Sequence, residues 1–314
     1  MGTLKDNLAV NGGPALISGG LKNRYNIGEE EKAAVMEMFD KAIETGQAPG
    51  YNGAKEEQLC SDFAQFMGGG YSDAVNSGTT AVYVALRALD IEPFSEIIVS
   101  PVTDPGGIMP IVMNNCIPVV ADASPGCYNT DAEQIAKRIT PFTKAIIVSH
   151  IMGEAADMPS IMSLAKKHGL KVLEDCAQAH CSKLNGQYVG TFGDVAAFST
   201  MFGKHFNTGG QGGMVFTKNE ATYWRIRQYA DRGKPFGLPE GSTNCVASLH
   251  FNLADLAAAI GLGQRQKLTG LGEARRKVSA SLKKKFSTLK TINIPDIPDN
   301  SEPSFWFWRL RYND

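Results

Sequence analysis

The chain has 314 residues, of which 43% are hydrophobic, and its formal net charge is −1. This length is sufficient for one large globular domain or for two unequal ones. The charge argues against a nucleic-acid-binding protein, which would carry a basic stripe, and the triplet Lys283–Lys285 is typical of a solvated helix face. No apolar run approaches the ~20 residues needed to cross a bilayer, so we expect no membrane partner.

The six cysteines form no CxxC pair and have no regular spacing. In a chain of this size, such a pattern indicates reduced thiols rather than a disulfide framework. The first twenty residues lack the basic segment and the apolar run of a secretion signal. We therefore expect a cytoplasmic protein.

Short apolar runs recur along the first two thirds of the chain, at residues 96–100, 118–122, 145–150, 171–175, 195–200 and 213–217. They are continuous rather than alternating, which is typical of strands that are covered on both faces. Between the third and the fourth run, residues 157–169 show helical spacing and end on Gly169, a typical helix cap. Strand, helix and strand in this order predict an α/β domain with a mostly parallel sheet.

The pattern changes after Thr217. Helices are predicted over 220–233 and 253–268 and from about Glu273 to Phe286. A Pro- and Asp-rich stretch then predicts an extended loop over 291–304, and the last ten residues resemble the beginning of a strand.

We divide the chain into an N-terminal arm and helix (1–45), a large α/β domain (46–235), and connecting helices with the start of a smaller α+β domain (236–314). Because the chain stops within a predicted strand, we expect this smaller domain to be incomplete.

Three polar turns follow predicted strands, and ligands of open α/β sheets bind at the carboxyl ends of the strands. In the first turn, Gly78, Thr79 and Thr80 open a strongly helical pattern. A helix N-terminus offers N–H groups and a positive dipole to a phosphate. Simple capping of the helix by Ser77 or Thr79 explains the same residues.

The second turn follows the strand 171–175, which ends on Glu174 and Asp175. Carboxylates at the end of a buried strand are costly unless each has a partner. Asp175 is suited to hold a ring nitrogen protonated, and Gln178 is near enough to reach the same ligand, although the segment by itself favours a structural capping role. For His180 we expect a hydrogen-bonded structural role.

The third turn carries Lys204, five residues after Ser199, and is followed by four glycines at 209, 210, 212 and 213. Glycines let the backbone pass close to a ligand. A partly desolvated lysine has a lowered pKa and reacts with aldehydes. An ordinary surface lysine in a flexible loop is the alternative for this segment by itself.

Together, the three turns outline a site for pyridoxal 5′-phosphate. Gly78 and Thr79 suit the phosphate, Asp175 and Gln178 suit the pyridine nitrogen and its neighbouring hydroxyl, and Lys204 suits the aldehyde. None of these residues forms a metal-ligand motif.

The chain also resembles the DegT/DnrJ/EryC1/StrS family of sugar aminotransferases over nearly its whole length. This family has the fold type I architecture of the aspartate aminotransferase superfamily. The resemblance rests on VNSGTTAVYVALRAL (75–89), ITPFTKAIIVSHIMGEAADMPSIMSLAKKHGLKVLEDCAQAH (139–180), NGQYVGTFGDVAAFST (185–200), GKHFNTGGQGGMVFT (203–217) and FNLADLAAAIGLGQ (251–264).

The resemblance implies a role for each residue of the three turns. Lys204 would form the Schiff base and shuttle the proton, Asp175 would pair with the pyridinium nitrogen, and Gln178 would bind the ring hydroxyl. The phosphate would be bound by the backbone amides of Gly78 and Thr79 and by the hydroxyl of Ser199.

The resemblance further implies a homodimer in which the site is completed by the neighbouring subunit. The family's Asn–Tyr–Arg-like triplet falls on His250, Phe251 and Asn252, so we expect His250 or Asn252 to reach the phosphate of the partner subunit.

Three positions differ from the family pattern. Asp104 stands where an aromatic ring would stack on the pyridine, Gln211 replaces an acidic residue, and His205 follows the lysine. Either another residue covers the ring, or the cofactor is held differently.

The implied function is the transfer of an amino group from glutamate or glutamine by a ping-pong mechanism. The acceptor would be a nucleotide-linked keto-sugar or a keto-cyclitol. The alternatives are a sugar dehydratase, whose family members carry His in place of the lysine, and a non-catalytic relative that binds the cofactor for regulation.

Overall fold

The computed structural model of the protein describes residues 8–19, 27–294 and 297–313. Parts of the expected N-terminal arm (1–7 and 20–26), two residues of the expected loop (295–296) and residue 314 lie outside the described residues.

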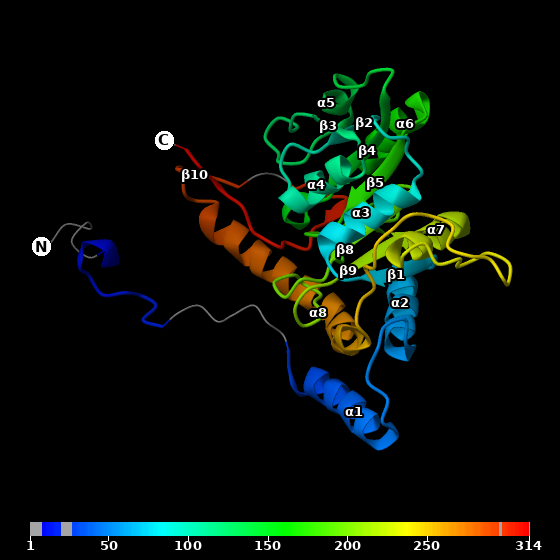
Figure 1. Ribbon diagram of the computed structural model, residues 1–314. Helices are drawn as coiled ribbons and strands as arrows, with labels where there is room; N and C mark the ends of the chain where they lie inside the picture. Colours follow the sequence, from blue (N-terminus) through cyan, green and yellow to red (C-terminus); the bar gives the residue numbers. More distant parts are fainter. Residues whose placement is uncertain (1–7, 20–26, 295–296, 314) are drawn as a thin grey trace, which may run out of the picture.

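A seven-stranded sheet forms the centre of the molecule (Figure 1). Its order is β1 (Tyr71–Val75), β9 (Gly213–Thr217), β8 (Val195–Ser199), β5 (Lys171–Asp175), β4 (Thr143–Ser149), β2 (Glu96–Val99) and β3 (Ile117–Val120). The strands β8, β5, β4, β2 and β3 are parallel to one another, whereas β9 is antiparallel to both of its neighbours. The prediction of a mostly parallel sheet is therefore confirmed.

Helices cover both faces of the sheet. One face carries α3 (Gly78–Ala88), α4 (Pro105–Met113) and α7 (Glu220–Ala230); the other carries α2 (Ala54–Phe66), α5 (Ala132–Ala136), α6 (Met158–His168) and the first half of α8 (Asp255–Phe286). The helix α1 (Glu29–Thr45) lies away from the sheet and packs against α8 (Figure 1).

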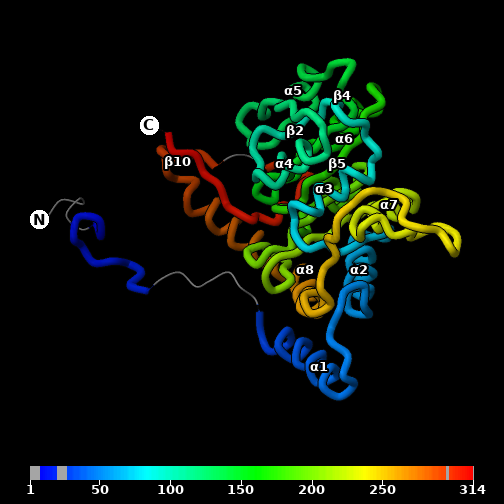
Figure 2. The backbone as a smooth tube through the Cα atoms, viewed as in Figure 1, coloured from blue at the N-terminus to red at the C-terminus, as the bar shows by residue number. Residues whose placement is uncertain are grey.

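Short elements complete the described chain. They are the 3₁₀ turns η2 (Ala9–Asn11) and η3 (Ile151–Gly153), the three-stranded sheet of β11 (Ser301–Glu302), β6 (Lys183–Leu184) and β7 (Gln187–Tyr188), and the pair β10 (Ile292–Asn293) and β12 (Arg311–Tyr312). The connection between α7 and α8 projects from the body (Figure 2).

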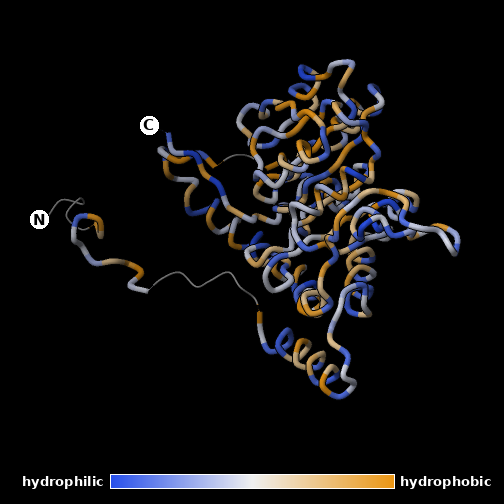
Figure 3. The backbone as a smooth tube through the Cα atoms, in the orientation of Figure 1, coloured by the Kyte–Doolittle hydropathy of each residue, from blue (hydrophilic) through white to orange (hydrophobic). Residues whose placement is uncertain are grey.

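Successive residues of each central strand enter opposite cores, since side chains alternate along a strand. In β2, Ile97 and Val99 pack under α3, whereas Ile98 packs under α6. In β8, Phe198 packs against Phe63 of α2, with ring centroids 5.0 Å apart. Hydrophobic stretches accordingly run through the middle of the body, and many outer turns are hydrophilic (Figure 3).

Three elements differ from the predictions. The two helices expected after residue 253 form the single helix α8. Gly272 lets this helix pack closely against Cys181, because a Cβ at Gly272 would lie 2.6 Å from Cys181 Sγ. The strand β1 was not predicted, since Asp73 interrupts its apolar run. The strand expected at the end of the chain is limited to Arg311–Tyr312, because Ser304 and Trp306 instead donate to backbone carbonyls of η3.

None of the helices among the described residues is both long enough and apolar enough to cross a membrane.

The packing of β8 leads to a stability prediction. Phe198 is fully buried between α2 and the loop that carries Lys204 and Phe206. Replacing Phe198 with Ala therefore removes a large side chain and leaves a cavity. We expect Phe198→Ala to lower the free energy of unfolding by about 3–5 kcal/mol. Urea denaturation followed by circular dichroism measures the change.

The matched control is Phe142→Ala, because the Phe142 side chain is 67% exposed. We expect its free energy of unfolding to change by less than about 0.5 kcal/mol. Equal destabilisation by the two substitutions would contradict the assignment of Phe198 to the core.

Candidate functional site

A cavity of about 260 Å³ lies at the carboxyl ends of β5 and β8 and at the N-terminal ends of α3 and α4. Five of the predicted site residues line it, namely Gly78, Thr79, Asp175, Ser199 and Lys204. A smaller space of about 20 Å³ adjoins it and is shared by Gln178, Asp175 and Lys204. The three polar turns therefore converge, as the topology of a parallel sheet predicts.

The start of α3 packs directly against the end of β8. Ser77 caps the helix, since its hydroxyl accepts a hydrogen bond from Thr80 N at 3.1 Å and Thr80 Oγ1 accepts one from Ser77 N at 3.0 Å. A Cβ on Gly78 would lie 2.5 Å from Ser199 Cβ, so only glycine fits there. Capping by Ser77 leaves the N-terminal dipole of α3 directed at the cavity, where it favours an anion.

A second helix N-terminus borders the same cavity. Asp104 caps α4 through a hydrogen bond from Gly106 N to its Oδ1 at 2.8 Å, and Pro105 occupies the first helical position. A Cβ on Gly107 would lie 3.2 Å from Asp175 Oδ2, so α4 approaches the base of the site closely. Asp104, which stands where the family pattern has an aromatic ring, is thus a helix cap. An Asp followed by Pro is a sequence pattern typical of the start of a helix.

Asp175 ends β5 and is 7% exposed. Burial raises the pKa of its carboxyl, while the hydrogen bond from Ala177 N and the nearby Lys204 ammonium oppose that rise. Gln178 Oε1 accepts a hydrogen bond from Met152 N at 2.8 Å, which fixes its amide and leaves the NH₂ group as a donor. A cationic ring nitrogen beside Asp175 would stabilise the ionised carboxylate.

Glu174, the neighbour of Asp175, has a structural environment. Its side chain is fully buried and accepts hydrogen bonds from Gly190 N, Phe192 N and Gly193 N at 2.7–2.8 Å and lies 3.0 Å from His150 Nε2. These donors compensate the cost of burying the charge and hold the 190–193 loop on the sheet.

Lys204 is half-buried, and its Nζ lies 3.8 Å from the centroid of the Trp306 ring. Trp306 is held in place by hydrogen bonds from its Nε1 to Gly203 O at 3.1 Å and from its N to Met152 O at 2.9 Å. Sequence reasoning missed Trp306, because an aromatic run about 100 residues after the lysine carries no spacing that points to the site. The ring shields the ammonium from water on one side.

The two histidines near Lys204 do not line the cavity. His180 is buried between the rings of Phe198 and Phe206, at centroid distances of 5.6 and 6.0 Å, and burial lowers its pKa well below the usual value. Burial among aromatic rings is consistent with the structural role expected for His180, which stays a prediction. His205 Nε2 lies 3.0 Å from Ser304 O, whereas the exposed Gln211 borders the cavity.

His250 and Asn252 do not line this cavity either. They lie together in the connection between α7 and α8, with Asn252 Nδ2 3.2 Å from His250 Nε2. His250 is exposed and its ring packs edge-on against Tyr51, at a centroid distance of 4.4 Å. Their contact with the phosphate of a neighbouring subunit stays a prediction.

Residues 27–311 match the sequence profile of the DegT/DnrJ/EryC1/StrS aminotransferase family. The chain belongs to this family. This membership confirms two properties that the resemblance implied, the type I fold and pyridoxal phosphate as the family's cofactor. It also confirms the enzyme class at the level of the family, a pyridoxal-phosphate-dependent aminotransferase.

Individual relatives agree with this membership. The chain is 30% identical to the spore coat polysaccharide biosynthesis protein SpsC of Bacillus subtilis strain 168, over 92% of this chain and 74% of SpsC. It is 33% identical to the GDP-perosamine synthase of Escherichia coli O157:H7, over 71% of this chain and 60% of that enzyme. The crystal structure of an aminotransferase from Psychrobacter cryohalolentis superposes with a TM-score of 0.81 at 29% identity, over 90% of this chain and 75% of that one.

The site residues of this family member fit pyridoxal phosphate. The N-terminal end of α3, with the glycine cradle formed by Gly78 against Ser199, suits a phosphate. Asp175 is buried in the wall of the cavity, and Lys204 lines the same cavity. The individual roles of these residues stay predictions.

The close contact at Gly78 leads to a second prediction. A methyl group there collides with Ser199 and moves the start of α3 away from the phosphate position. We expect Gly78→Ala to weaken binding of pyridoxal phosphate at least about tenfold, as measured by absorbance titration of the purified protein.

Gly210→Ala serves as the control, because a Cβ at Gly210, in the loop that follows Lys204, meets no atom within 4 Å. Its affinity for the cofactor should equal that of the unmodified protein. If both variants bind normally, the glycine cradle is not the phosphate site.

Proposed function

We propose that the protein is an aminotransferase that takes an amino group from glutamate or glutamine. The acceptor is the keto group of a nucleotide-linked sugar or of a cyclitol. The observation that carries this proposal is the convergence of Lys204, Asp175 and the N-terminus of α3 on one cavity. Polysaccharide biosynthesis and perosamine synthesis, named for two relatives, support a sugar acceptor.

When bound, pyridoxal phosphate supplies an aldehyde that condenses with amines and a ring that accepts electrons. Lys204 would be the amine that attaches the cofactor, and its Nζ would hold and return the proton at the substrate carbon next to nitrogen. Its environment suits both tasks, because the Trp306 ring excludes water on one side and the cavity is open on the other.

Asp175 would accept the hydrogen bond of the protonated ring nitrogen. Burial raises the pKa of Asp175, and a protonated ring nitrogen beside the carboxylate would lower that pKa again and favour its ionised form. Gln178 would donate its NH₂ group to the ring hydroxyl, while Ser199 Oγ and the amides of Gly78 and Thr79 would bind the phosphate.

We also propose a homodimer with the site at the subunit interface, in a reducing compartment such as the cytoplasm. His250 is exposed where the chain returns from the projecting connection to α8, which supports a contact with a second subunit, whereas Asn252 beside it is 7% exposed. All six cysteines are unpaired, which is consistent with a reducing compartment.

A dehydratase is the weaker alternative. Such relatives carry His at the lysine position, where this chain has Lys204, and His205 is directed away from the cavity towards Ser304 O. The complete set of Asp175, Gln178, Ser199 and Lys204 also disfavours a purely regulatory binding protein.

The covalent attachment is tested with borohydride. Reduction of the holoprotein should fix the cofactor to the peptide that contains Lys204, as seen by mass spectrometry, and glutamate should convert the unreduced cofactor to its pyridoxamine form. Lys204→Ala should abolish both results, because no other amine is placed at the cavity wall among the described residues.

The exposed Lys218→Ala variant, at the end of β9, is the control and should behave like the unmodified protein. An unchanged adduct in Lys204→Ala would overturn the proposal. Screening keto-sugar nucleotides and keto-cyclitols for return of the pyridoxamine form to pyridoxal phosphate then identifies the acceptor class.

Hybrid dimers test the subunit interface. The Lys204→Ala variant and the double variant His250→Ala with Asn252→Ala should each lose conversion of the cofactor by glutamate. In a mixed dimer, one site then combines an intact Lys204 with intact residues 250 and 252 from the other subunit, so conversion should return. Absence of recovery, with mixed dimers verified by differential tagging, would show that His250 and Asn252 do not act across the interface.

A further inference from the structure

Asp104 borders the cofactor cavity in addition to capping α4. It lines the cavity of about 260 Å³ and also the adjoining space of about 20 Å³, in both cases together with Lys204 and Asp175. A space of that size has room for about one water molecule. The three charged residues therefore surround a single small volume.

The carboxylate of Asp104 presents its charge to this volume. Its Oδ1 accepts the hydrogen bond from Gly106 N at 2.8 Å, and no described residue donates a hydrogen bond to its Oδ2. Asp104 is exposed, and solvent-exposed carboxylates are ionised at neutral pH. The cap on α4 fixes the position of this negative charge.

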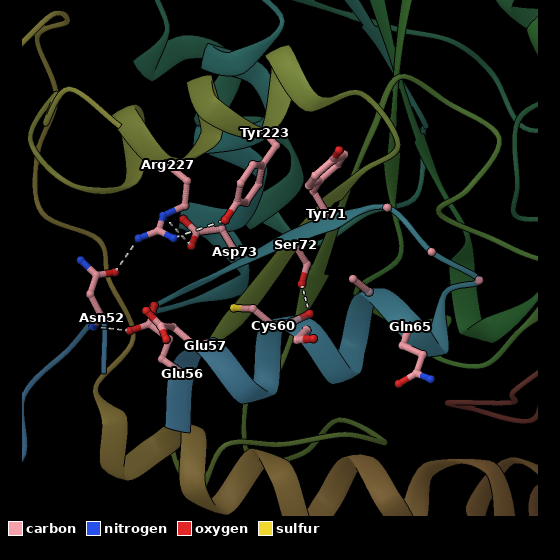
Figure 4. A pocket seen from close by; sticks show the side chains of 15 residues that line it. Asn52, Glu56, Glu57, Cys60, Gln65, Tyr71, Ser72, Asp73, Tyr223 and Arg227 are labelled. Atoms are coloured by element: carbon pink, nitrogen blue, oxygen red, sulfur yellow. Dashed lines mark hydrogen bonds and ion pairs between the residues drawn. The ribbon is translucent and has the colours of Figure 1, made fainter. Parts of the chain in front are cut away.

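Carboxylates at another cavity of the protein differ in this respect. Glu56 and Asp73 border a cavity of about 720 Å³ between α2 and α7 (Figure 4). Their side chains are each 2% exposed, and the oxygens to which no described residue donates are buried in the wall. These oxygens cannot be reached by a ligand, whereas the carboxylate of Asp104 can.

The charges around the cofactor cavity act on one another. Burial is the main cause of the raised pKa of Asp175, the Lys204 ammonium opposes that rise, and the Asp104 carboxylate adds to it. Asp104 and Asp175 are the two carboxylates, and Lys204 the one ammonium, among the described residues that line the cavity. Two negative charges beside one positive charge favour the protonated form of the lysine nitrogen.

Three histidines also lie near these groups. His150 Nδ1 accepts a backbone N–H at 3.1 Å, so its Nε2 carries the hydrogen that it directs at Glu174 Oε2, 3.0 Å away, and the ring is neutral. Burial lowers the pKa of His180 well below the usual value, so this ring is neutral as well. His205 directs its Nε2 at a backbone carbonyl 3.0 Å away. The anionic partners of the lysine nitrogen are therefore the two carboxylates.

Position 211 shows the opposite difference from the family pattern. Gln211 lines the same cavity and stands where the pattern has an acidic residue, whereas Asp104 stands where it has an aromatic ring. One carboxylate is thus lost from the wall and one is gained. The exchange keeps the charge of the cavity and moves it to the N-terminal end of α4.

We propose that Asp104 holds a proton on Nζ of Lys204 while this nitrogen is joined to the cofactor. The inference rests on the Schiff-base role proposed above for Lys204. In that arrangement Asp175 faces the ring nitrogen and the dipole of α3 faces the phosphate, so Asp104 is the carboxylate that remains to balance the charge on Nζ. A protonated nitrogen makes the adjoining carbon more electrophilic, which favours attack by the amine of the donor.

A pH titration of the visible absorbance of the holoprotein tests this role, because the protonated and unprotonated forms absorb at different wavelengths. Asp104→Asn removes the charge and keeps a residue that caps helices well. We expect the midpoint of the titration to fall by at least about 0.5 pH unit, since loss of a nearby negative charge disfavours the protonated nitrogen. The exposure of Asp104 limits the shift, because water screens its charge.

Two further variants separate charge from packing. Gln211→Glu in the Asp104→Asn background returns a carboxylate to the cavity wall and should move the midpoint back towards that of the unmodified protein. Asp157→Asn is the matched control, because Asp157 is an exposed N-cap of α6 that lines neither of the two spaces. Its midpoint should equal that of the unmodified protein.

The outcomes distinguish this inference from the proposed function. An unchanged midpoint in Asp104→Asn, an equal shift in Asp157→Asn, or a shift that Gln211→Glu leaves uncorrected would overturn the role of Asp104. The attachment of the cofactor to Lys204 would stand in each of these cases. If the unmodified protein forms neither a visible absorbance band nor a borohydride adduct, the proposed function fails and this inference fails with it.

Discussion

The approach of Gly78 to Ser199 is the contact on which the geometry of the cofactor cavity depends. It sets the start of α3 against the end of β8, and no side chain larger than hydrogen fits between them. Because β8 pairs with β5, the same contact fixes the distance from the helix dipole to Asp175. The lysine loop leaves the end of β8, so Lys204 is placed by the same strand. A single van der Waals contact thus relates all three parts of the site.

The sequence predicted the central strands and the three polar turns because their patterns are local. Continuous apolar runs mark β2, β4, β5, β8 and β9, and the order of strand and helix implies where their ends meet. The stacking of Trp306 on Lys204 was not predictable, since it depends on how the chain returns to the sheet about 100 residues later. The strand β1 escaped prediction for a chemical reason, because Asp73 is a charged residue in a buried strand.

The buried acids of this protein divide into two kinds. Glu174 receives several donors from the chain and needs nothing further, which marks it as structural. Asp175, Glu56 and Asp73 have raised pKa values because burial exceeds what their protein partners offset. At the cofactor cavity, the raised pKa of Asp175 fits its predicted pairing with a protonated ring nitrogen, which would lower that pKa again.

The position of Trp306 has a consequence for the order of events during synthesis. All strands of the central sheet are made by residue 217, so the sheet can form while the rest of the chain is still being translated. The ring beside Lys204 and the carbonyl of Ser304 beside His205 are added much later. The shielding of Lys204 therefore comes from a part of the chain that is made about 100 residues later, and it is added only after Trp306 has left the ribosome.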